Sequence, residues 1–122
     1  MKVIVQKYGG TSVGSPEKIQ AIAARIQKLK KQGPCRIAVV VSAMSGETNR
    51  LLGLCNTVNP DSKNSFRDFV VSAGEQVSCG LLAMAFQKLG MKAKPFLAFQ
   101  LGLKTNQIFS GCLLYTSDAA DE

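Results

Sequence analysis

The 122-residue sequence contains no histidine and no tryptophan, and its four cysteines form no CxxC pair. The absence of histidine excludes a Ser-His or Cys-His hydrolase within this chain and argues against a zinc site. Scattered cysteines of this kind are typical of free thiols in a reducing compartment. Long apolar runs are also missing, because none, including the one at residues 37–41, approaches the roughly 20 residues of a membrane span.

Acidic residues are scarce. Fifteen Lys and Arg residues stand against eight Asp and Glu residues, which gives a net charge of +7. This surplus favours anionic partners such as nucleotides, phosphates, nucleic acid or anionic membrane, and does not choose among them. With 46% apolar residues, the length suits one small globular domain. The apolar stretch near the N-terminus is too short for a signal peptide, so we expect a cytoplasmic protein.

The first forty residues have the pattern of a strand, a helix and a second strand. Residues 3–5 are an apolar run, and Ser15 followed by Pro16 is typical of a helix start. The predicted helix then repeats apolar residues at helical spacing, namely Ile19, Ile22, Ala23, Ile26 and Leu29. Residues 37–41 are a β-branched run typical of a strand covered on both faces. We therefore predict two parallel strands joined by a right-handed crossover.

The remaining pattern is mainly helical. We predict a polar loop at residues 42–49, a helix from about Leu51, a turn at residues 59–61, and helix over residues 65–89 with an interruption near Gly74. Residues 93–98 have the composition of a further strand, in which Pro95 favours an edge or strand-start position. Together these elements predict the α/β class, with helices covering an open sheet.

A glycine-rich turn follows the first predicted strand, where Lys7 precedes Gly9, Gly10 and Gly14. Such a turn at a helix N-terminus offers backbone N–H groups to an anion. It is not a P-loop, because Ser-Pro follows Gly14 where Lys and then Ser or Thr are needed, and GxGxxG is also absent. From spacing alone, an ordinary strand-to-helix turn explains the glycines equally well.

Two further polar segments are candidates for a binding site. The loop at residues 42–49 follows the second predicted strand, where open α/β sheets bind ligands, although Thr48 or Asn49 explains it equally well as a helix cap. In the segment SAGEQ, Ser72 with Glu75 three residues later favours a capping box over a site for a substrate ammonium group. The polar sequence Lys-Thr-Asn at residues 104–106 indicates nothing by itself.

The C-terminal residues 112–122 differ from the rest of the chain. They read CLLYTSDAADE, in which acidic residues suddenly dominate. This string resembles the translation of a transposon adapter used in preparing sequencing libraries, and a natural acidic C-terminus is the alternative. We therefore expect residues 112–122 to be a non-native tail and residues 1–111 to be the N-terminal part of a longer protein.

Four segments occur together in the order and approximate spacing of one enzyme family. They read KYGGTSVGSPEKI, VVVSAMSGETNRLL, VSAGEQVS and KTNQIF, and they resemble the aspartate kinases over essentially all of residues 1–111. The resemblance implies the amino-acid-kinase fold, a three-layer α/β/α architecture with an open, mainly parallel sheet, here truncated. It also implies phosphoryl transfer from ATP, bound with Mg²⁺ as a substrate complex, to the side-chain carboxylate of L-aspartate. The product, 4-phospho-L-aspartate, begins the routes toward lysine, threonine and methionine.

The resemblance also implies roles for individual residues. Lys7 matches the family's phosphate-binding lysine, which stabilises the transition state, and the phosphate and ATP contacts continue along Gly9, Gly10, Thr11 and Ser12. No tightly bound metal is expected.

Three further positions match those that hold aspartate in this family. They are Ser42, Thr48 and Glu75, with Glu75 pairing with the α-ammonium group. The resemblance therefore shifts the interpretation of Glu75 from a capping residue toward a binding residue, although it can do both.

The resemblance is incomplete. Tyr8 stands where the family commonly has Phe, and the family's second half, with most of the ATP pocket and the regulatory domains, is absent. We expect the chain alone to be inactive and poorly soluble, and the full-length protein to be a homo-oligomer with no nucleic-acid or membrane partner.

Two alternatives remain open. The first is another enzyme of the same fold, of the glutamate 5-kinase, acetylglutamate kinase or uridylate kinase type. The second is a non-catalytic basic binding module, which the scattered basic residues and the missing aromatic platform argue against.

Overall fold

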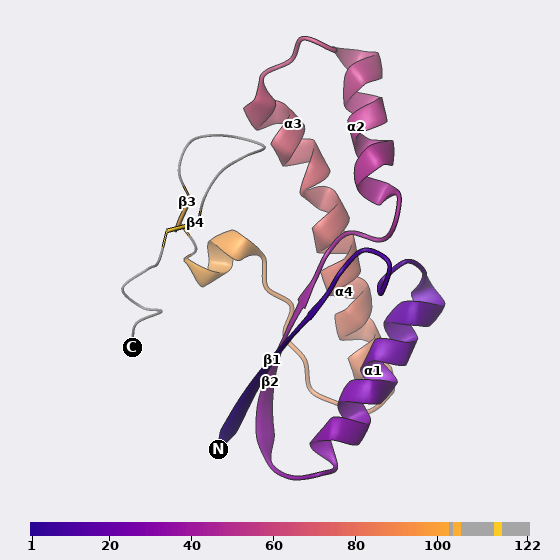
Figure 1. Ribbon diagram of the computed structural model, residues 1–122, viewed down its shortest axis with the longest axis vertical. Coiled ribbons are helices and arrows are strands. Elements are labelled where there is room, and N and C mark those ends of the chain that lie inside the picture. Colours follow the sequence, from indigo (N-terminus) through magenta and orange to yellow (C-terminus); the bar gives the residue numbers. More distant parts are fainter. Residues whose placement is uncertain (103, 106–113, 116–122) are drawn as a thin grey trace.

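The computed structural model describes residues 1–102, 104–105 and 114–115. Its elements are, in order, β1 (Lys2–Tyr8), α1 (Pro16–Lys30), β2 (Cys35–Val41), α2 (Glu47–Val58), α3 (Asn64–Val71), α4 (Ala73–Lys88), the 3₁₀ helix η1 (Ala98–Leu101), β3 (Lys104–Thr105) and β4 (Leu114–Tyr115) (Figure 1). The helices and strands alternate at first and the chain then becomes helical, which confirms the predicted α/β class.

The two long strands, β1 and β2, form a parallel pair. Their register runs from Lys2 opposite Cys35 to Tyr8 opposite Val41, so the two strands end together. The connection between them is α1, as the sequence pattern predicts. Parallel strands need such a crossover, because a short turn cannot return the chain to the same end of the sheet.

The start of α1 confirms the prediction made from Ser15 and Pro16. Ser15 has an extended backbone, and its Oγ accepts a hydrogen bond from the backbone N–H of Lys18 at 3.3 Å. Pro16 occupies the first turn, where its missing N–H costs nothing, and Glu17 beside it is favoured by the positive end of the helix dipole. Local chemistry alone is therefore sufficient to fix where this helix begins.

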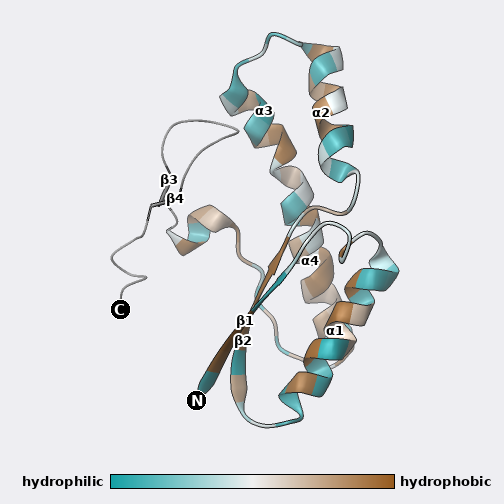
Figure 2. Cartoon of the chain, in the orientation of Figure 1, coloured by the Kyte–Doolittle hydropathy of each residue, from teal (hydrophilic) through white to brown (hydrophobic). Residues whose placement is uncertain are grey.

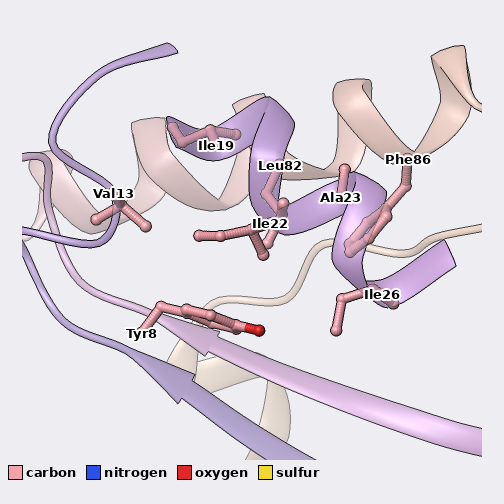
Figure 3. Close-up of a cluster of buried hydrophobic side chains, with 8 residues drawn as sticks. All are labelled: Tyr8, Val13, Ile19, Ile22, Ala23, Ile26, Leu82 and Phe86. Carbon is pink, nitrogen blue, oxygen red and sulfur yellow. The ribbon is translucent and has the colours of Figure 1, made fainter. Parts of the chain in front are cut away.

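The hydrophobic core lies between α1, α4 and one face of the strands. Figure 3 shows its eight buried side chains, which are Tyr8, Val13, Ile19, Ile22, Ala23, Ile26, Leu82 and Phe86. Four of them form the predicted apolar face of α1. Burying each large aliphatic side chain contributes about 1.5–3 kcal/mol to folding. We refer to β1, α1, β2 and α4 together as the core unit.

The sheet is covered on one face only in the described part of the chain, which corrects the prediction for β2. Burial alternates along both strands, and Val3, Val5 and Val40 on the opposite face are 65%, 68% and 49% exposed. The β-branched composition of residues 37–41 predicted two covered faces, but α1 and α4 pack on the same side. The described residues therefore supply two of the three layers that the resemblance implies.

Helix α2 begins at Glu47, earlier than the predicted start near Leu51. Gly46 precedes it with φ of 82°, a left-handed conformation that glycine adopts without strain, and no side chain caps the helix. Thr48 and Asn49 lie inside the helix, so the alternative in which one of them is the cap is wrong.

The long helical segment after residue 64 divides into α3 and α4 at Ser72, close to the predicted position, although the chain direction there stays helical. The predicted capping box is absent: Ser72 has helical backbone angles, and its Oγ donates to the carbonyl of Phe69 at 2.8 Å. Because the backbone stays helical here, the N–H of Gln76 bonds to the Ser72 carbonyl. By length and composition alone, the combined helix Asn64–Lys88 could cross a membrane, although Leu82 and Phe86 on it belong to the core.

Helices α2 and α3 form a hairpin that projects from the core unit (Figure 1). The predicted turn between them is confirmed, because Asn59 Oδ1 accepts from the N–H of Asp61 at 3.0 Å. The two helices are joined by a hydrogen bond from Arg67 Nη2 to Asn56 Oδ1. We refer to α2 and α3 as the arm. Brown apolar stretches occur on both of its helices (Figure 2).

The predicted strand at residues 93–98 is wrong. Residues 91–97 have no regular structure, and η1 then begins at Ala98. Pro95 has no N–H to give to a ladder, and within the described residues the segment pairs with no strand. The described pairs Lys104–Thr105 and Leu114–Tyr115 form a short antiparallel ladder. Asn106 lies outside the described residues. Apart from residues 114–115, so do residues 112–122, and the non-native tail stays a prediction.

Candidate functional site

The candidate site lies at the carboxyl ends of β1 and β2. Because the two strands end in register, the glycine-rich turn and the loop at residues 42–46 leave the sheet side by side. A hydrogen bond joins them where they leave the strands, because the N–H of Ser42 donates to the carbonyl of Tyr8 at 3.2 Å. Ligands of open α/β sheets bind at this edge, where the strand ends leave room between loops.

The glycine-rich turn is held in a tight conformation by its own backbone. The N–H groups of Ser12 and Val13 both donate to the carbonyl of Gly9, at 3.0 and 3.2 Å. Val13 is fully buried and anchors the turn to the core, and Lys18 Nζ donates to the carbonyl of Thr11 at 2.9 Å. The turn is therefore fixed at its far end by the core and by α1.

Glycines allow this turn to approach the second loop closely. A Cβ added at Gly10 would lie 3.4 Å from the carbonyl oxygen of Ala43, and one added at Gly14 would lie 3.6 Å from Ser45 Cβ. Neither glycine has a positive φ, and both separations are ordinary van der Waals contacts. The two loops pack directly against each other.

The third motif joins the same cluster from α4. A Cβ added at Gly74 would lie 2.9 Å from the Cβ of Ala43 and 3.5 Å from Glu47 Cγ. Gly74 and Ala43 are both buried. Three segments far apart in the sequence therefore meet around Ala43, and each of them contains residues that the resemblance assigns to substrate binding.

The predicted phosphate-binding residues lie along the end of β1 and the turn. Lys7 is exposed on the open face of the sheet, where it is opposite Val40 in the register. Thr11 and Ser12 are exposed, Gly9 is exposed, and Gly10 is half-buried against Ala43.

The predicted aspartate-binding residues surround the second loop and the start of α4. Ser42 and Thr48 are half-buried on either side of the loop, whereas Glu75 is exposed in the first turn of α4. Within the described residues, neither Lys7 nor Glu75 is committed to an ion pair. Their charges therefore remain available to a ligand.

Sequence reasoning missed an ion pair beside this cluster. Arg50 Nε and Nη2 donate to the two carboxylate oxygens of Glu47 at 3.0 and 2.6 Å. These hydrogen bonds hold the pKa of Glu47 below its usual value. The i, i+3 spacing of Glu47 and Arg50 predicts an ion pair only if both residues are in one helix. The sequence placed the helix start near Leu51, so this pair was not predicted.

Comparisons with known proteins identify the family of this chain. A family model described as the amino acid kinase family matches residues 2–118. The chain belongs to the amino acid kinase family. This membership confirms the resemblance on which the fold was predicted.

Relatives within this family include several aspartokinases. The chain is 45% identical over 106 residues to the aspartokinase of Pseudomonas aeruginosa, and 44% identical over 106 residues to that of Thermus thermophilus. Each alignment covers 87% of this chain and 26% of the relative. The chain therefore spans about a quarter of the length of these relatives.

Solved structures of amino acid kinases share the fold. An aspartate kinase from Synechocystis has a TM-score of 0.67 and 45% identity, covering 70% of this chain and 15% of that protein. The E. coli aspartokinase III in complex with aspartate and ADP has a TM-score of 0.76 over 93% of this chain and 35% of that protein. At 17% identity, the second likeness supports the fold alone.

Proposed function

We propose that this chain is the N-terminal part of the catalytic domain of an aspartate kinase, which transfers a phosphoryl group from ATP to the side-chain carboxylate of L-aspartate. The observation that supports this most directly is the meeting of the glycine-rich turn, the loop at residues 42–46 and the start of α4 around Ala43. The identity of 45% to an aspartokinase supports the choice of aspartate among the substrates of this fold.

The proposed chemistry needs positioning and charge stabilisation more than proton transfer. A carboxylate with a pKa near ~4 is already ionised at neutral pH, so it can attack phosphorus without a general base. The attacking oxygen takes the phosphoryl group, and the electron pair of the broken bond leaves with ADP. The protein must hold two anions together and stabilise the charge on the transferring group.

Lys7 and the glycine-rich turn have the properties required for the phosphate side. Lys7 is exposed near the end of β1, and only Tyr8 separates it from Gly9, where the turn begins. Gly9 and Gly10 allow a phosphate to approach the backbone closely, and Thr11 and Ser12 add exposed hydroxyl groups. In our proposal Lys7 neutralises charge that develops during transfer.

Ser42, Thr48 and Glu75 have the properties required for the aspartate side. Two half-buried hydroxyl groups suit the carboxylates of the substrate, and the exposed carboxylate of Glu75 suits its α-ammonium group. In our proposal these three residues together match both ends of a small zwitterion, because the hydroxyl groups face its carboxylates and Glu75 faces its ammonium group.

The nucleotide is proposed to arrive as MgATP. An aspartokinase with the same fold is described in complex with aspartate and ADP, and the nucleotide proposed here agrees with that description. Among the described residues no three His, Cys, Asp or Glu side chains gather as a metal site. In our proposal the metal is held mainly by the phosphates of the nucleotide, as is common for Mg²⁺ in phosphoryl transfer.

A chimeric enzyme tests the proposal. Residues 1–102 of this chain replace the aligned segment of the P. aeruginosa aspartokinase, and acyl phosphate formation from ATP is measured with L-aspartate, L-glutamate, N-acetylglutamate and UMP. We expect activity with L-aspartate only. A folded chimera that prefers another acceptor, or that has no activity while the parent is active, would contradict the proposal.

The same proposal extends to the organisation of the protein. We propose that residues 1–111 are native, that residues 112–122 are not, and that the 122-residue chain has no measurable kinase activity alone. We also propose a cytoplasmic homo-oligomer. Sequencing the source DNA across codon 111 with primers outside the reading frame tests the first of these points, because a kinase frame that continues past Gly111 identifies the tail as an artefact.

A non-catalytic basic binding module stays the alternative from a different class. Steeply salt-dependent retention on heparin, unaffected by ATP or aspartate, would favour it.

A further inference from the structure

Gly74 makes the closest approach of any described glycine to a neighbouring segment. A Cβ at this position would lie 2.9 Å from Ala43 Cβ, a separation that real side chains do not adopt, and 3.5 Å from both Glu47 Cγ and Leu51 Cδ1. Gly74 has no positive φ, and its helix would be more stable with alanine there. The absence of a side chain at residue 74 is therefore explained by packing.

The atom that Gly74 faces cannot easily move away. Ala43 Cβ is bonded directly to the backbone, and Ala43 is only 5% exposed. A methyl group at residue 74 would therefore have to displace the backbone of the loop or the start of α4.

The other neighbours of Gly74 are also restrained. Glu47 is held by two hydrogen bonds from Arg50, and Leu51 is 7% exposed. Gly74 is thus enclosed by the loop after β2 on one side and the first turns of α2 on the other. A methyl group at residue 74 would therefore shift the residues next to this contact, which are Ser42 on the loop and Glu75 on α4.

We propose that Gly74 is a positioning residue whose bare backbone, seated on Ala43, sets the separation between Glu75 and the Ser42–Thr48 side of the aspartate site. This inference rests on the proposed function, since it assigns a role to a residue that touches no substrate. Glu75 follows Gly74 directly and is on a rigid helix, so a shift of the contact moves Glu75 relative to the hydroxyl groups that bind the other end of the same substrate.

The test is a compensating pair of substitutions in the chimeric kinase. Gly74→Ala should raise KM for L-aspartate roughly tenfold, because small displacements of positioning groups have large effects on binding and catalysis. The KM for ATP should change much less. Adding Ala43→Gly removes the Cβ that the new methyl group meets, and the double variant should recover most of the lost aspartate affinity.

Gly80→Ala is the matched control. Gly80 is in the same helix, and a Cβ there meets no atom within 4 Å. Gly80→Ala should therefore leave KM for aspartate at the value of the chimera, and in the 122-residue chain it should leave the thermal unfolding midpoint unchanged or raise it. Gly74→Ala should lower that midpoint.

The outcomes separate this inference from the proposed function. An unmutated chimera without aspartate kinase activity contradicts the function. An active chimera in which Gly74→Ala and Gly80→Ala have the same KM for aspartate contradicts the positioning role alone. If Gly74→Ala fails to fold, the double variant with Ala43→Gly tests the inference. A double variant that also fails to fold, or that folds with a raised KM for aspartate, overturns the role given to the Ala43 contact.

Discussion

The core unit and the arm contain similar apolar residues but differ in what covers them. Eight side chains of the core unit and its turn are buried together, whereas Leu51 is the only buried residue in α2 and none is buried in α3. Phe66 and Phe69 in the arm are 63% and 83% exposed. Apolar composition alone therefore does not predict stability, because the hydrophobic contribution comes from area removed from water.

The candidate site lies where these two regions meet. Lys7 is at the end of a strand in the core unit, Glu75 is in the first turn of α4, and Thr48 is in the first turn of α2. In our proposal, the core unit supplies a rigid phosphate end and the arm supplies part of the aspartate end. Four predictions test this division, and they follow in order of the expected effect.

The largest effect is expected at Lys7, on the core unit. Lys7→Ala in the chimeric kinase should lower kcat by about 10²–10³-fold, because the ammonium group stabilises charge in the transition state, while KM for aspartate changes little. Lys2→Ala removes the same charge from the other end of β1 and should leave kcat unchanged. Similar steady-state kinetics for the two variants would mean that Lys7 has no phosphate role.

The next effect separates the two regions by stability. Leu82→Ala in the core unit should lower the free energy of unfolding by about 2–5 kcal/mol, because it leaves a cavity in packed surroundings. Leu54→Ala in the arm should lower it by about 1 kcal/mol or less, because Leu54 is already 50% exposed. Urea unfolding of the 122-residue chain measures both, and equal losses would show that the arm is as well packed as the core unit.

A smaller effect is expected at the junction. Glu75→Gln should raise KM for aspartate by about ten- to a hundredfold with a smaller change in kcat, because a hydrogen bond to a charged group is worth about 1.5–3 kcal/mol. Glu17→Gln removes the same charge from the first turn of α1 and should have no such effect. Initial rates over a range of aspartate concentrations give both values, and an unchanged KM in the Glu75 variant would remove Glu75 from the site.

The smallest effect is expected in the arm, at the ion pair of Glu47 with Arg50. The hydrogen bonds from Arg50 lower the pKa of Glu47 from 4.5, so the pair stabilises the fold above that pH, and this stabilisation disappears as the pH falls through the folded pKa. Arg50→Ala should therefore lower the unfolding midpoint at neutral pH and have less effect near pH ~3.

Arg25→Ala is the control for the ion pair. Arg25 is exposed on α1 and belongs to no ion pair among the described residues, so its substitution removes the same charge without breaking a pair. The difference between the two arginine variants should shrink as the pH is lowered. A difference that persists at low pH would mean that Arg50 acts through packing of its aliphatic stem.

Elements whose signals are local were predicted well from the sequence. Helix α1 begins as predicted because Ser15 and Pro16 act within one turn, and the turn after α2 forms because Asn59 Oδ1 accepts from the backbone N–H of Asp61. The capping box at Ser72 was wrong for a complementary reason. The chain continues from α3 into α4 without leaving helical angles, so no free helix end exists there to be capped.

Elements that need a partner were predicted less well. Residues 93–98 have a composition suited to a strand, yet a strand forms only where a neighbouring strand accepts its hydrogen bonds. The covering of β2 on both faces failed for the same reason, because burial of the second face requires a layer that the described residues do not contain. The residues of the candidate site were named from motifs, and their side-chain roles stay predictions.

The sequence by itself determined the order of the elements as far as α4, the start of α1, the parallel pairing of β1 with β2 and the family to which the chain belongs. These follow from periodicity, capping and motifs, which act over a few residues or are read as a string. Only the tertiary structure decided that Gly10, Ala43 and Gly74 meet, and that Gly74 must lack a side chain. That contact joins residues distant in the sequence. Whether a side chain fits at residue 74 depends on van der Waals distances to those residues, which a one-dimensional pattern does not encode.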